Sequence, residues 1–112
     1  MEMYENFKEL QMNGGMLAKE LLDACGTGEW QNEKIYCYDD LEELAEYELY
    51  EGWYTGWFND IEKYSRSYFN GAPNPFEFID LKGLGLALSR SWDESVYYLA
   101  STGEVLSTSY GW

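Results

Sequence analysis

Carboxylates dominate the chemistry that this sequence offers between residues 35 and 62. That segment contains nine Asp and Glu residues and no Lys, Arg or His. Paired carboxylates can bind calcium or catalyse glycoside hydrolysis. The segment lacks the glycine turn and ligand spacing of an EF-hand loop, and the 112-residue chain shows no cleft-forming architecture typical of a hydrolase. The nine residues are Asp39, Asp40, Glu42, Glu43, Glu46, Glu48, Glu51, Asp60 and Glu62.

Other catalytic arrangements find little support. The chain has no histidine, which excludes a Ser-His or Cys-His nucleophile pair. Cys25 and Cys37 alone make a poor zinc site, and we expect both to be small, buried, reduced residues. No glycine-rich phosphate loop or dinucleotide fingerprint occurs. We therefore expect a protein that is not an enzyme and uses no metal or cofactor.

The charge of the whole chain points to a class of partner. Against 21 Asp and Glu there are seven Lys and Arg, which leaves a net charge of -14. Such a chain repels nucleic acids and anionic membranes, so its expected partners are basic protein surfaces. The alternative is that the acidity only keeps a small protein soluble.

Aromatic residues between the carboxylates indicate that the acidic segment is folded. Residues 35–62 contain eight aromatic side chains, whereas a disordered acidic tail is poor in them. On a helix, carboxylates four residues apart stand about 5–6 Å from each other, close to the phosphate spacing of a nucleic-acid strand. A basic groove that binds phosphates would then bind this array. The alternative is an ordinary solvated helix face.

The sequence predicts that these residues are positioned by one α+β domain over 1–112, in which several helices pack on a short antiparallel sheet with a C-terminal hairpin. Alternation predicts a strand near 34–38, with Ile35 and Cys37 on one face and Tyr36 and Tyr38 on the other. Apolar spacing and caps predict helices within 14–25, 40–50, 60–71 and 80–91. Two strand-like runs joined by a turn predict a hairpin at 95–110.

The helix at 40–50 would carry most of the acidic array. Asp39 or Asp40 caps it, and Glu42, Glu43 and Glu46 share an arc with Asp39. Glu48 falls in the opposite, apolar arc. Either the helix turns before Glu48, which we favour, or this carboxylate is partly buried against an unidentified partner.

Two details of the other helices bear on packing. In the helix within 14–25, the expected core side chains are those of Met16, Leu17, Leu21, Leu22 and Cys25. In the helix at 80–91, capped by Asp80, Gly83 and Gly85 each weaken the helix by about 1 kcal/mol relative to alanine. The close approach of another backbone would explain them.

Two groups of residues resemble the ArdA-type antirestriction proteins of plasmids, transposons and phages. The first is Ile35-Tyr36, Asp40-Leu41, Tyr50, Gly52, Gly56, Trp57 and Asp60. The second is Phe78-Ile79-Asp80 with Gly85 and Leu88, followed by the 95–110 hairpin. The resemblance implies a DNA mimic that occupies the DNA-binding groove of a type I restriction-modification enzyme. The long acidic middle of the family is missing here, so an anti-CRISPR that blocks a Cas effector is an equal alternative.

We therefore expect a non-enzymatic inhibitor of a host defence nuclease, from a phage or mobile element. Its partner-binding residues would be the nine carboxylates and Trp53. A second hypothesis is a small acidic interaction or regulatory module that docks on one protein partner through an aromatic surface at 50–58. The sequence is also compatible with a homodimer. Glu2 and Glu5 stand where a signal peptide needs positive charge, which favours the cytoplasm of the host cell.

Overall fold

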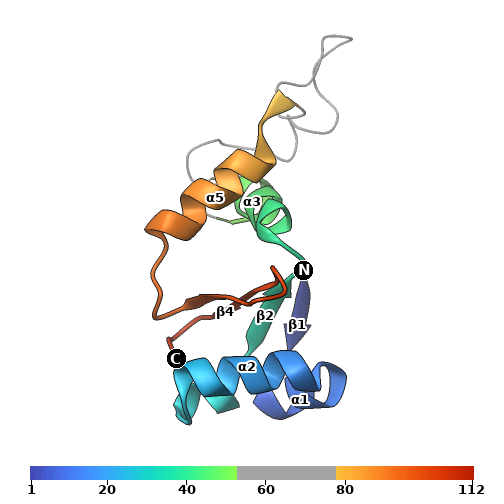
Figure 1. Ribbon diagram of the computed structural model, residues 1–112, viewed down its shortest axis with the longest axis vertical. Coiled ribbons are helices and arrows are strands. Elements are labelled where there is room, and N and C mark those ends of the chain that lie inside the picture. Colours follow the sequence, from blue (N-terminus) through green and yellow to red (C-terminus); the bar gives the residue numbers. More distant parts are fainter. Residues whose placement is uncertain (53–77) are drawn as a thin grey trace.

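The computed structural model describes residues 1–52 and 78–112. They form an antiparallel sheet with helices against both faces, which confirms the predicted α+β class (Figure 1). In chain order the elements are β1 (Glu2–Tyr4), α1 (Phe7–Asn13), α2 (Gly15–Cys25), the 3-10 helix η1 (Glu29–Asn32), β2 (Ile35–Tyr38), α3 (Leu41–Tyr50), α5 (Leu81–Ser91), β3 (Tyr97–Leu99) and β4 (Val105–Thr108).

The sheet brings the two ends of the described chain together. Its strand order is β1-β2-β4-β3, and all neighbours are antiparallel. Cys37 pairs with Leu106, which in turn pairs with Tyr98. Strands β3 and β4 form the predicted hairpin. Strand β2 lies in the middle, which explains why its side chains are mostly buried on both faces.

One face of the sheet packs on α1, α2 and η1. Ile35, Cys37 and Leu106 point to this side and share a core with Leu10 and Leu21, which are both fully buried. The other face packs on α3, where Tyr38 and Val105 surround Leu44. The alternation predicted for residues 35–38 is therefore confirmed, and each face of β2 belongs to a different core.

Helix α3 also packs closely against α5 (Figure 1). A Cβ atom at Gly85 would overlap the backbone carbonyl oxygen of Leu41 and lie 2.7 Å from its carbon. The predicted close backbone approach is therefore confirmed at Gly85. At Gly83 the nearest atoms belong instead to the capping side chain of Asp80, which accepts a hydrogen bond from the Gly83 amide at 3.0 Å.

Three details near the N-terminus differ from the sequence-based expectations. Met16, expected in the core, is 91% exposed, whereas Ala18, which was not expected there, is fully buried. Residues 29–32, where no helix is predicted, form η1, which buries Trp30. The edge strand β1 was not predicted, because three residues show too little alternation to indicate a strand.

The expected helix at 60–71 lies outside the described residues. Within the part of the chain that is described, no helix is long and apolar enough to cross a membrane.

Candidate acidic interaction face

Helix α3 displays carboxylates at its N-terminal end because its capping and its first turn both favour negative charge. Asp40 is the N-cap, and its Oδ1 accepts a hydrogen bond from the amide of Glu43 at 2.8 Å. Glu42 and Glu43 occupy the first turn, next to the positive end of the helix dipole. We call the following set the acidic face: Asp39, Asp40, Glu42, Glu43 and Glu46.

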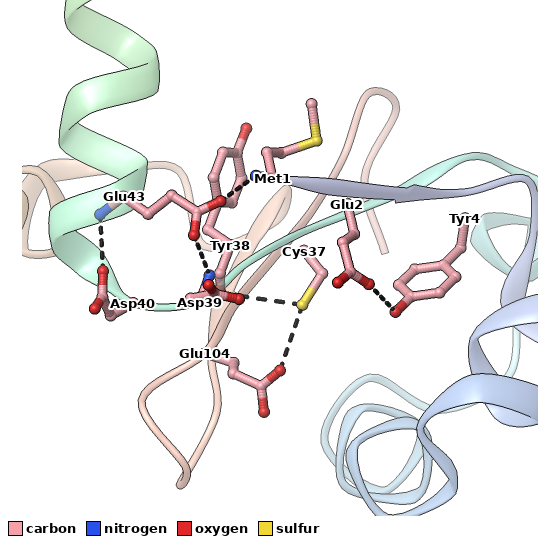
Figure 2. A network of polar contacts seen from close by, with 9 residues as sticks. All are labelled: Met1, Glu2, Tyr4, Cys37, Tyr38, Asp39, Asp40, Glu43 and Glu104. Atoms are coloured by element: carbon pink, nitrogen blue, oxygen red, sulfur yellow. Dashed lines mark hydrogen bonds and ion pairs between the residues drawn. The ribbon is translucent and has the colours of Figure 1, made fainter.

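Four members of the acidic face are exposed, and Glu43 is only partly so. The Glu43 carboxylate accepts a hydrogen bond from the Asp39 amide at 3.0 Å and pairs with the amino group of Met1 (Figure 2). Together with the Asp40 cap, these contacts hold the start of α3 in a reciprocal capping arrangement. The main role of Glu43 is therefore to hold the start of α3 in place, and the other four carboxylates present the exposed charge.

The electrostatics of the face reflect this crowding of like charge. The pKa of the Asp39 carboxyl is raised, first by the negative charge of Glu43 and then by a hydrogen bond to it. Burial acts to raise the pKa of Glu43, but the bonds from the Met1 amino group and the Asp39 amide outweigh it and lower that pKa. A cation brought by a partner would relieve the repulsion at Asp39.

The prediction that the helix turns before Glu48 is wrong. Helix α3 continues to Tyr50, and Glu48 is buried on its sheet-facing side. The hydroxyl of Tyr97, on β3, donates a hydrogen bond to the Glu48 carboxylate at 3.4 Å. Burial, together with the charge of Glu48, raises the pKa of Tyr97 to about 12. Glu48 is therefore a structural residue, and it is not available as a surface contact.

The remaining predicted site residues fall into two groups. Glu51 is exposed at the C-cap of α3, and it lines a groove of about 400 Å³ together with Met1, Glu43, Glu46, Tyr47 and Tyr50. Trp53, Asp60 and Glu62 lie outside the described residues, as does most of the aromatic surface predicted at 50–58. The structure thus brings together the carboxylates of 39–46 with Glu51 and separates Glu48 from them.

The two cysteines are not bonded to each other. Cys37 is buried with its Sγ 3.6 Å from an Oε of Glu104 (Figure 2). Burial and the negative charge of Glu104 raise the pKa of the Cys37 thiol to about 12, which leaves almost no thiolate at neutral pH. Cys25 is half-buried, and burial raises its pKa as well. Among the described residues, no group of three or more His, Cys, Asp and Glu side chains is arranged to hold a metal ion.

Two features of the site could not be derived from sequence. Strand β1 pairs with β2 and thereby brings Met1 to Glu43, a contact between residues far apart in the chain. A second, apolar groove borders the acidic face between α3, α5 and the tip of the hairpin. Its walls come from three separate segments, so only the tertiary structure reveals it.

Comparisons with known proteins found no matching family model, no matching curated protein and no matching solved structure.

Proposed function

We propose that this protein is a non-enzymatic inhibitor of a nucleic-acid-binding host defence enzyme and that the acidic face occupies the enzyme's basic groove. One observation carries this proposal: α3 presents a group of carboxylates on a rigidly held helix. Capping contacts hold its first turn, and its other side packs against the sheet and α5. A rigid array needs little ordering when it binds, whereas a flexible acidic tail would lose conformational entropy.

The charge around the array supports the proposal. Between described residues, the contact of Glu43 with the Met1 amino group is the only salt bridge. The exposed carboxylates of Asp39, Glu42 and Glu46 therefore form no such pair within residues 1–52 and 78–112. Solvent-exposed charges carry no desolvation penalty in the free protein. They attract a basic partner over a Debye length of about 8 Å at physiological salt.

The candidate targets are a type I restriction-modification enzyme and a Cas effector, because both hold nucleic acid in a positively charged channel. The protein would act in the cytoplasm of the host cell, where these enzymes work. Its acidic face would release counterions from the channel in the way that phosphates do.

Charge reversal restricted to exposed residues tests the proposal. We expect a variant with Asp39→Lys, Glu42→Lys and Glu46→Lys to stay folded, because lysine is a good helix former and none of these side chains is buried. Glu43 and Asp40 remain unchanged because they cap α3. The variant should inhibit its target more than about tenfold less strongly, measured by nuclease activity and by binding.

A matched control separates local from global charge. Glu5→Lys, Asp23→Lys and Glu29→Lys change the net charge equally, but these exposed residues lie on the segments that pack on the other side of the sheet. This control should keep most of the inhibition. Equal losses in the two variants would show that only net charge matters, and full inhibition by the first variant would reject the acidic face as the working surface.

A further inference from the structure

Beside the acidic face lies an apolar groove with a volume of about 420 Å³. Leu41, Leu86, Leu99 and Ala100 provide its apolar lining, while Asp40 and Glu42 stand at its rim. Leu86 is 45% exposed and Leu99 is 43% exposed, although both are large aliphatic residues on regular elements. We call this site the apolar groove.

The walls of the apolar groove are held in place by contacts outside it. The absence of a side chain at Gly85 lets α5 approach the backbone of Leu41, which sets the distance between α3 and α5. On the opposite side, the carboxylate of Glu20 accepts hydrogen bonds from the Ser101 amide and hydroxyl at 2.8 and 2.6 Å. These bonds tie the hairpin tip to α2. The groove is therefore preformed, as ligand sites usually are.

The charges at the rim indicate the chemistry of the occupant. Asp40 and Glu42 are exposed members of the acidic face, so anything that enters the groove also meets their carboxylates. Lys82 is the one cationic residue at the rim, and its aliphatic stem can cover apolar surface while its ammonium group stays in water. The overall charge of -14 extends the negative field around the groove. An apolar side chain flanked by cationic residues matches both the floor and the rim.

We infer that the apolar groove binds a protein segment in which a large aliphatic side chain is flanked by Arg or Lys, and that this contact anchors the target next to the acidic face. The inference rests on the proposed function and adds a source of specificity to it. Electrostatic contacts steer association, whereas a buried apolar anchor in a pocket contributes affinity that salt does not screen.

Two short peptides test the inference without knowledge of the target. One carries a central leucine flanked by two arginines on each side, and the other carries serine in place of the leucine. Their binding to the wild-type protein is measured by fluorescence anisotropy at low and high salt. The leucine peptide should bind about tenfold more tightly than the serine peptide, because the leucine side chain leaves water. This ratio should persist when salt weakens both peptides.

Variants locate the binding. Leu86→Gln, and separately Leu99→Thr, should abolish the preference for leucine, while Met16→Gln should retain it. Met16 is a matched control because it is exposed, apolar and helical but lies on the far side of the sheet. Circular dichroism and thermal melting verify that each variant is folded. Shifts of amide resonances around Leu86 and Ala100, recorded by NMR, provide a second measurement that does not depend on substitutions.

Each other outcome has a defined meaning. Equal binding of the two peptides, with strong salt dependence, would overturn the apolar groove and leave the proposed function intact. A preference for leucine that survives both groove variants, or no binding of either peptide, would overturn the inference. Sedimentation that shows a wild-type dimer and a Leu86→Gln monomer would identify the occupant as a second copy of the chain, which also overturns it.

Discussion

At the scale of single residues, Glu20 connects the helical layer to the hairpin. Its carboxylate accepts hydrogen bonds from the hydroxyl groups of Tyr98 and Ser101, at 2.7 and 2.6 Å, and from the Ser101 amide at 2.8 Å. The bond from the Ser101 hydroxyl contributes most to lowering the pKa of Glu20 below its ordinary value, followed by the bond from Tyr98. All three hydrogen bonds stabilise the ionised form of the Glu20 carboxylate relative to its protonated form.

Replacing Glu20 with glutamine should therefore destabilise the protein in a pH-dependent way. Because the folded protein holds the Glu20 pKa below its value in the unfolded chain, the stabilisation is fully present above the unfolded pKa. It disappears as the pH falls through the folded pKa. Urea unfolding of wild type and Glu20→Gln should show a stability gap near neutral pH that closes in acid. Asp23→Asn, an exposed change of equal charge on the same helix, should show no such closing gap.

Glu48 shows how far the sequence can predict a single residue. Helical periodicity placed it correctly in the apolar arc of α3, but its burial depends on Tyr97, which lies 49 positions away on β3. No local pattern records such a contact. Exposure of Asp39, Asp40, Glu42 and Glu46 could be predicted, because their arc lies opposite the buried side chains of Leu44 and Leu49.

At the scale of elements, the starts of α3 and α5 could be predicted because a capping aspartate marks each of them, whereas the start of α1 at Asn6 was not predicted. Asp40 and Asp80 each accept a hydrogen bond from the third residue of their helix. Asn6 does the same for Glu9, whose side chain in turn accepts from the Glu5 amide. Strand β1 could not be predicted, because a three-residue edge strand is defined by its pairing with β2. The burial of Met16 was predicted wrongly because α2 packs on the sheet with one side only, so that only a narrow stripe of its residues is buried.

The packing of α3 on α5 should depend on the missing side chain at Gly85. In Gly85→Ala the added methyl group would overlap the Leu41 carbonyl, so the two helices must separate. We expect unfolding free energy to fall by about 1–3 kcal/mol, even though alanine favours helices. Gly15→Ala is the matched control, since nothing lies within 4 Å of the Cβ position there. That control should be neutral or slightly stabilising, and thermal or urea unfolding distinguishes the two.

The Gly85 variant also connects stability to the site. A wider gap between α3 and α5 would change the apolar groove that these helices line, so binding of the leucine peptide should weaken in the folded fraction. A Gly85→Ala variant as stable as wild type would show that the helices can adjust without cost, and the groove would then not be preformed.

At the scale of the whole molecule, the sheet separates two cores, and the acidic face belongs to the layer built by α3 and α5. The fold class, the hairpin and three of the helices could be predicted, because each has a local signal in periodicity, caps or turns. The proximity of the acidic face to Met1 and to the apolar groove could not be predicted, because it depends on the strand order and on the packing of the helices. These long-range arrangements define the candidate site.

Competition for one groove is the most direct test of the central claim. A labelled DNA duplex bound to a restriction-modification enzyme, or to a Cas effector, is titrated with the wild-type protein while anisotropy reports the bound duplex. If the acidic face mimics nucleic acid, we expect complete displacement, an apparent Kd that rises linearly with the duplex concentration, and affinity that falls steeply with salt. A ternary complex that retains the duplex, with affinity indifferent to salt, would contradict nucleic-acid mimicry and favour docking through the aromatic surface at 50–58.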